Sequence, residues 1–162
     1  MRVYLIRHAD AAPLGENGIT TDEDRPLTGL GQAQCQNLAT ALQKHDVKLD
    51  QIVSSPLLRA RETAEGLRKH WQTPLKEILL CDDLGPNGKP KKLSRFVRNL
   101  QAESVALVGH MPDISDYLTW LMGSKKVHIP LDKAGTAYLE CGDDLGKGDG
   151  VLVWLVTPAW CG

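Results

Sequence analysis

Arg7 and His8 are the side chains near the start of this sequence that are best suited to chemistry. They directly follow an apolar run, Val3 to Ile6. β-Branched and aromatic residues in such a run predict a buried strand, which places the basic pair at the strand's carboxyl end. Open α/β sheets bind their ligands at that edge. A guanidinium beside an imidazole suits an anion that the imidazole can attack, and phosphate is the leading candidate.

Two later segments bring similar groups to the ends of predicted strands. The strand predicted over 52–53 is followed closely by Arg59, and the strand predicted over 105–108 is followed by His110. If these strands are parallel, their carboxyl ends lie at the same edge of one sheet. We therefore expect both residues to join Arg7 and His8 in a single crevice.

Strand and helix patterns alternate along most of the chain. Ser55 is the expected N-cap of a helix with Pro56 as its first residue, Pro112 opens a later helix, and Gly123 ends it. Strands are predicted at 3–6, 52–53, 75–80, 105–108, 137–141 and 151–156, and a helix that begins at Thr28 has an apolar stripe formed by Leu30, Ala33, Leu38, Ala41 and Leu42. These patterns predict one three-layer α/β domain over residues 1–162. Its mixed, mostly parallel sheet of about six strands has helices on both faces and ends in an antiparallel hairpin.

The composition excludes several classes of protein. Nineteen basic residues are offset by 20 acidic ones, a balance that argues against nucleic-acid binding. The longest apolar runs are the length of a strand, so we expect no membrane segment. The start of the chain is too short in apolar residues for a signal peptide. Four widely separated cysteines indicate reduced thiols in a cytoplasmic protein.

Four ordered motifs resemble those of the histidine phosphatases, the phosphoglycerate-mutase-like superfamily. They are Leu5-Ile6-Arg7-His8-Ala9, Pro26-Leu27-Thr28-Gly29-Leu30-Gly31-Gln32-Ala33, Ser54-Ser55-Pro56-Leu57-Leu58-Arg59-Ala60-Arg61-Glu62-Thr63-Ala64 and Val108-Gly109-His110. The family commonly has glycine at the position of Ala9, whereas its short branch of SixA-like phosphohistidine phosphatases often has alanine. The short chain also agrees with that branch, because larger relatives carry helical insertions that cover the site.

The resemblance implies that His8 is the nucleophile and that Arg7, Arg59 and His110 form the phosphate pocket with it. His8 must be neutral at its attacking nitrogen, so we expect its other nitrogen to donate to a backbone carbonyl. Phosphoryl transfer to His8 would give a phosphohistidine intermediate that water hydrolyses. No cofactor is expected, since the two arginines and a protonated His110 could supply the positive charge that a metal supplies elsewhere.

The general acid is less clearly marked. Many relatives use a glutamate after the third strand, and Asp83, next to Asp82, is the nearest candidate here. Another branch has an aspartate directly after the second histidine, where this chain has Met111; Asp113 lies two residues further on. The leaving imidazole of a phosphoramidate is easier to expel than an alkoxide, so a weak acid favours phosphohistidine as the substrate.

Three functions stay open at this point. The first is dephosphorylation of a phosphorylated protein such as a histidine-phosphotransfer domain. The second is hydrolysis of a small phosphate ester, a sugar phosphate or a nucleotide. The third is a non-catalytic phosphoprotein-binding module. A basic run that could steer an acidic phosphoprotein comprises Lys89, Lys91, Lys92, Arg95 and Arg98.

Overall fold

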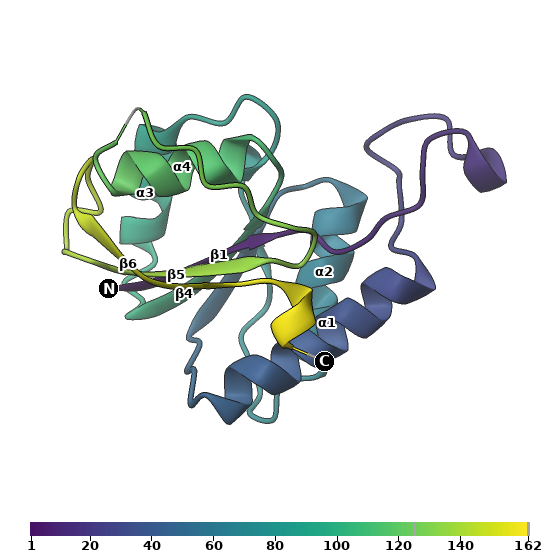
Figure 1. Cartoon of the computed structure of the whole chain (residues 1–162), viewed down its shortest axis with the longest axis horizontal. Coiled ribbons are helices and arrows are strands. Elements are labelled where there is room, and N and C mark those ends of the chain that lie inside the picture. The colour runs from purple at the N-terminus through teal and green to yellow at the C-terminus, as the bar shows by residue number, and fades with distance from the viewer. Residues whose placement is uncertain (125, 162) are drawn as a thin grey trace.

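The computed structural model describes residues 1–124 and 126–161, which form an α/β domain (Figure 1). The strands are β1 (Arg2–Arg7), β2 (Gln51–Ser54), β3 (Leu79–Leu80), β4 (Ser104–Gly109), β5 (Thr136–Cys141) and β6 (Gly150–Val156). The α-helices are α1 (Gly29–Lys44), α2 (Leu58–Lys69), α3 (Pro90–Asn99) and α4 (Asp113–Leu121). Three short 3-10 helices complete the list: η1 (Glu16–Gly18), η2 (Asp82–Leu84) and η3 (Pro158–Trp160).

The sheet has six strands in the order β3-β2-β4-β1-β5-β6. The first four are parallel, whereas β5 pairs antiparallel with both β1 and β6. This arrangement confirms the predicted mixed sheet with its C-terminal hairpin. It also sets β1 between β4 and β5, so the strand that leads to Arg7 and His8 lies at the centre of the sheet.

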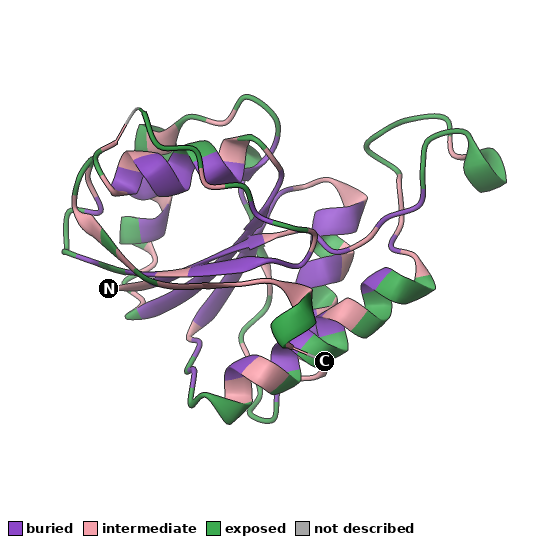
Figure 2. Ribbon diagram, in the orientation of Figure 1, coloured by how far each residue is buried: buried purple, intermediate pink, exposed green. Residues whose placement is uncertain are grey.

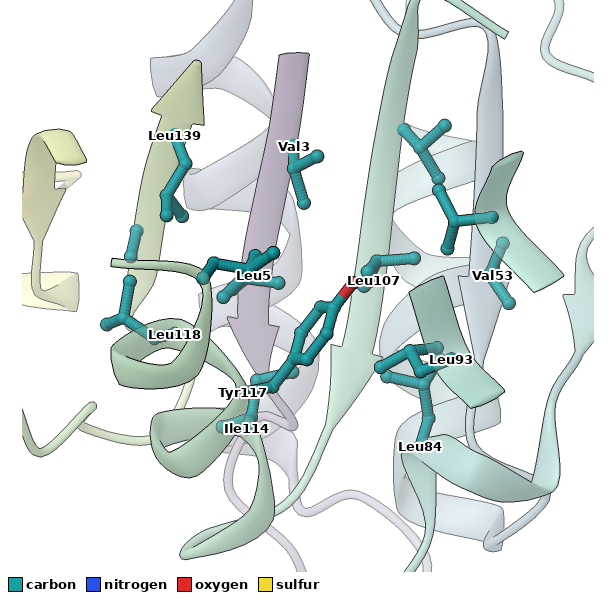
Figure 3. Close-up of a cluster of buried hydrophobic side chains, with 14 of the residues drawn as sticks. Val3, Leu5, Val53, Leu84, Leu93, Leu107, Ile114, Tyr117, Leu118 and Leu139 are labelled. Atoms are coloured by element: carbon teal, nitrogen blue, oxygen red, sulfur yellow. The ribbon is translucent and has the colours of Figure 1, made fainter. Parts of the chain in front are cut away.

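Alternating residues of the central strands face two hydrophobic cores. On one face, Val3 and Leu5 of β1 pack with α3 and α4, and Figure 3 shows Tyr117 of α4 against this side of the sheet. On the other face, Tyr4 and Ile6 pack with α1 and α2. Strands β2 and β4 are buried throughout, and β1 is buried except at its two end residues, Arg2 and Arg7 (Figure 2). Helices therefore cover both faces, which leaves the edge formed by the strand ends to hold a site.

The third strand and the start of α2 differ from the prediction. Only Leu79 and Leu80 of the predicted strand 75–80 pair with β2, since Lys76 and Glu77 interrupt the apolar run. The N-cap of α2 is Leu57, not Ser55. The Ser55 hydroxyl instead accepts a hydrogen bond from Leu57 N and contacts His110. Ser55 therefore belongs with the end of β2, where it lies beside His110.

The buried stripe of α1 is also displaced from the predicted one. Leu30 is 61% exposed, and Ala33 is exposed as well. The buried residues are Gly31, Cys35, Leu38, Ala39 and Leu42. The first turn of α1 packs on backbone: a Cβ on Gly31 would lie only 2.0 Å from the carbonyl oxygen of Asp10. Thr28 caps the helix as predicted, by accepting from Gly31 N at 3.1 Å.

The C-terminal end of α4 and the state of the cysteines agree with the predictions. Gly123 follows the end of α4 with a positive φ of 78°, as expected of a C-terminal glycine. Cys35, Cys81 and Cys141 are buried free thiols, and Cys161 is a partly exposed one. Among the described residues, none of the helices has the length and apolar character needed to cross a membrane.

Candidate active site

Parallel pairing brings three strand ends to one edge of the sheet. In register, Arg7 of β1 lies beside Gly109 of β4. The pairing continues past the strands, because His8 N donates to the Gly109 carbonyl at 2.9 Å and Ser55 N donates to the Val108 carbonyl at 2.9 Å. The residues that follow each strand are thereby fixed by backbone hydrogen bonds next to one another, as the sequence predicts.

His8 is held in one tautomer. The residue is 7% exposed, and Nδ1 of its ring lies 2.7 Å from the carbonyl oxygen of Ala9. A carbonyl only accepts, so Nδ1 carries the hydrogen and Nε2 keeps a lone pair. Burial, together with the charges of Arg59, Arg7 and Arg25, lowers the pKa of His8 to about 4. The expected neutral imidazole with a backbone-bound second nitrogen is therefore present.

Arg59 and Arg7 supply the positive charge around this imidazole. Arg59 lies in the first turn of α2, is 5% exposed, and directs Nε at His8 Nε2 from 3.3 Å. Arg7 donates from Nη1 to the Leu131 carbonyl at 2.8 Å. Its Nε is buried and has no hydrogen-bond partner among the described residues. A buried N–H without a partner is costly, and an anion bound here would satisfy it.

His110 lies beside His8, with 5.1 Å between the ring centroids. Its Nε2 is 2.8 Å from the Ser55 hydroxyl, and its buried Nδ1 lacks a partner within the described chain. Burial, then the charges of Arg59 and His8, lower the pKa of His110 to about 3. At neutral pH this lowered pKa favours the neutral ring, and the protonated His110 that the sequence allows stays a prediction for the phosphate-bound site.

The acidic candidates are bound to backbone N–H groups of nearby loops. Asp83, in η2, accepts from Lys89 N at 3.0 Å, just before α3. Asp113 accepts from Asn87 N at 2.9 Å. Neither carboxylate has a hydrogen bond to His8, Arg7, Arg59 or His110 among those of the described chain. The structure thus gives both aspartates a role in holding loops, and the acid function of Asp83 stays a prediction.

The loop between β1 and α1 contributes two residues that the sequence did not mark. Asp22 accepts from Arg59 through both its backbone oxygen, 2.6 Å from Nη1, and its carboxylate, 2.9 Å from Nη2. Arg25 donates to the same carboxylate at 2.9 Å. An irregular loop has no periodicity, so nothing in its residue pattern indicated that it reaches Arg59.

Further contacts fix the segment that carries His8. The Thr63 hydroxyl of α2 accepts from Ala9 N at 3.0 Å and donates to the Arg59 carbonyl at 2.6 Å. Asp10, to which the sequence assigned no role, binds Lys133 and Thr28, each at 2.6 Å. These contacts connect the segment that carries His8 with α1, α2 and the 131–135 loop, and they limit its movement.

Across residues 1–124 and 126–161, no group of three or more His, Cys, Asp or Glu side chains is placed to hold a metal ion. The polar groups gathered at the strand ends are instead two arginines and two histidines. Such a set is suited to a tetrahedral anion, since guanidinium groups bind phosphate oxygens through oriented N–H donors.

Comparison with known proteins agrees with this description. Residues 3–83 match the family model described as the histidine phosphatase superfamily (branch 1). The chain is 32% identical to an uncharacterized protein of Picosynechococcus sp., over 99% of this chain and 98% of that protein. It is 30% identical to the phosphohistidine phosphatase SixA of Escherichia coli K12, over 69% of this chain and 68% of that protein.

The fold of the chain is also similar to that of a solved structure. The structure of the protein histidine phosphatase SixA complexed with tungstate superposes with a TM-score of 0.84 at 24% identity, over 98% of each chain. The chain belongs to the histidine phosphatase superfamily.

Proposed function

We propose that this protein is a phosphatase that removes the phosphoryl group from protein phosphohistidine through a covalent intermediate on His8, without a metal cofactor. One observation carries the proposal: the Nε2 lone pair of a neutral, buried His8 faces Arg59 Nε at 3.3 Å, while Ala9 holds the opposite nitrogen. Membership of the histidine phosphatase superfamily supports phosphatase activity.

In the proposed reaction, His8 Nε2 attacks the phosphorus of the bound phosphohistidine. A bond forms between Nε2 and phosphorus, and the bond from phosphorus to the substrate imidazole breaks. The leaving imidazole takes up a proton, for which Asp83 is the candidate donor. Water then attacks the phosphoryl group on His8, which releases inorganic phosphate and restores the imidazole.

Charge and hydrogen bonding explain the roles proposed for the other three residues. Arg7 and Arg59 stabilise the equatorial oxygens of the phosphoryl group in the transition state. His110 contributes its unpartnered Nδ1. Because a phosphoryl dianion reverses the local charge, its binding favours the protonated form of His110, which can then donate to an oxygen.

The proposed substrate is a protein because no α-helix of the described chain lies across the strand ends that carry the site. The four α-helices of the described chain lie on the two faces of the sheet (Figure 1), so none of them forms a lid across the strand ends. The similarity to a SixA phosphohistidine phosphatase supports the same class of substrate.

The exposed cations of α3 and its approach, Lys89, Lys91, Lys92, Arg95 and Arg98, offer a docking surface for an acidic phosphoprotein. Only Arg98 has an acidic partner among the described residues, Asp144 at 4.0 Å. A reducing compartment such as the cytoplasm would suit the four free thiols.

The test compares a histidine-phosphotransfer protein phosphorylated on histidine with para-nitrophenyl phosphate, for the wild type and for His8→Ala. Dephosphorylation of the protein by the wild type and its loss in H8A are expected. Activity on the small ester alone would replace the proposal with a small-ester phosphatase. Activity on neither substrate, with inorganic phosphate still bound, would indicate a binding module.

A further inference from the structure

A chain of polar contacts connects the β1–α1 loop to the nucleophile. Arg25 donates from Nε to the Ala12 carbonyl at 2.7 Å and from Nη1 to Asp22 Oδ1 at 2.9 Å. Asp22 in turn accepts from Arg59, whose Nε faces His8. Since Ala12 lies four residues after His8, these contacts close a ring that begins and ends at the nucleophile segment.

Asp22 occupies one side of the Arg59 guanidinium and leaves another for the pocket. Its backbone oxygen and carboxylate accept from Nη1 and Nη2, respectively. Nε points instead to His8. A guanidinium is planar and rigid, so holding its two terminal nitrogens fixes the direction of Nε. The side chain of Arg59 is 6% exposed and that of Asp22 is 50% exposed, so Asp22 holds the buried arginine from the solvent side.

The loop is anchored where this contact is made. Residues 13–18 and 20–24 are exposed, and the loop projects away from the sheet (Figure 1). Glu23 nevertheless accepts from Leu58 N, the first residue of α2, at 3.0 Å. Asp22 and Glu23 are thus docked on the same helical turn that carries Arg59.

We infer that Asp22 is a positioning residue, which orients Arg59 so that its Nε edge meets a phosphoryl group at His8 Nε2. This inference rests on the proposed function. Asp22 acts through Arg59 and does not itself contact the reacting atoms.

Two other roles for Asp22 are disfavoured. Hydrogen bonds from Arg25 and Arg59 lower the pKa of Asp22, so the carboxylate is ionised at neutral pH and cannot serve as the proton donor. Asp22 could compete with phosphate for Arg59 only from the side of the guanidinium that faces His8. It binds the two terminal nitrogens instead. Removing Asp22 should accordingly weaken phosphate binding.

The experiment measures inorganic phosphate binding by calorimetry for the wild type, Asp22→Ala, Asp22→Asn and Asp24→Ala. D22A is expected to lose about 10- to 100-fold in affinity, as for a lost charge-assisted hydrogen bond that orients a group. D22N keeps one oxygen that can accept from Arg59 Nη2 but loses the charge and the second acceptor, which binds Arg25, so it should lose less affinity than D22A. D24A is the matched control, because Asp24 lies in the same loop and accepts from Thr21 instead of an arginine.

A second readout follows His8 itself by NMR. When Arg59 is released in D22A, its charge moves away from His8 and the pKa of His8 should rise, whereas D22N, which keeps one acceptor for Arg59, should raise it less. Asp22→Ser, a second truncation, is expected to behave as D22A does. Affinity equal to or tighter than wild type in both truncations would overturn the inference. Phosphate affinity and the pKa of His8 are both measured without turnover, so they distinguish failure of this inference from failure of the proposed phosphatase activity.

Discussion

Lowering the pH should leave His8 neutral until well below the range in which histidine ordinarily titrates. Burial is the largest cause, and Arg59, Arg7 and Arg25 add to it, so that the pKa falls from its ordinary 6.5 to about 4. A difference of about 2.5 pH units corresponds to ~3 kcal/mol between the two protonation states. Less than about 1% of His8 should be protonated at pH 6.5, which keeps Nε2 available as a nucleophile.

NMR titration of the histidine side chains in phosphate-free buffer measures this value. The His8 signals are assigned by their loss in His8→Ala. The expected midpoint lies near pH 4. A midpoint near pH 6.5 would refute the reasoning, because it would mean that the pocket neither desolvates His8 nor surrounds it with positive charge.

Two variants separate the effect of burial on the pKa of His8 from the effect of the neighbouring charge. Arg59→Met keeps an apolar side chain in the pocket but removes the nearest cation, so the pKa of His8 should rise part of the way and stay below 6.5, since burial contributes more than Arg59 does. Arg61→Met is the matched control from the same helix, because Arg61 is exposed. An equal rise in both variants would contradict a local effect of Arg59.

The lowered pKa values of the two buried histidines also determine how the free energy of unfolding depends on pH. His8 and His110 have lower pKa values folded, about 4 and about 3, than in an unfolded chain, where about 6.5 is expected. The unfolded chain therefore binds more protons at acid pH. The contribution of both residues to the free energy of unfolding is therefore complete above about pH 6.5. It is lost as the pH falls from there towards 4 for His8 and 3 for His110.

Three further changes test the proposed proton donor, the packing of the first turn of α1 and the basic surface of α3. Asp83→Asn should slow hydrolysis of an alkyl phosphate by about 100-fold or more if Asp83 is the proton donor, with less effect on phosphohistidine; equal rates for D83N and the control D82N would exclude that role. Gly31→Ala should lower the free energy of unfolding in denaturant titrations by roughly 1–3 kcal/mol, since its Cβ would lie 2.0 Å from the Asp10 oxygen. Gly29→Ala, with no atom within 4 Å, should not. Lys91→Glu with Lys92→Glu should raise KM for an acidic phosphoprotein at low salt but not for para-nitrophenyl phosphate, while Lys44→Glu with Lys69→Glu should change neither.

The convergence of the pocket residues was predictable because backbone pairing determines it. Arg7 and His110 stand directly at or after parallel strands, and Arg59 follows a third strand closely, so the order of apolar runs was enough to place them together. The tautomer of His8 followed from its chemistry. Its hydrogen bond to Ala9 then had to be seen in the structure, since no residue pattern specifies a backbone carbonyl as partner.

Local rules failed where tertiary contacts replaced them. Ser55 has the residue type and position of an N-cap, but its hydroxyl is needed at His110. Leu30 has helical spacing with the core residues, yet the first turn of α1 packs through Gly31 on the Asp10 backbone and leaves Leu30 in solvent. Asp22 lies in an irregular loop, where neither periodicity nor spacing predicts a contact with a helix 37 residues further along the chain.

The most direct test of the account is detection of the phosphoryl group on His8. The protein is mixed with phosphorylated substrate, quenched during turnover in alkaline denaturant, and examined by intact mass spectrometry and by 31P NMR. We predict one added phosphoryl group, bonded to Nε2 of His8, that appears within the first turnover and is absent from His8→Ala. Turnover without a phosphorylated enzyme, or with the group on another residue, would contradict nucleophilic attack by His8.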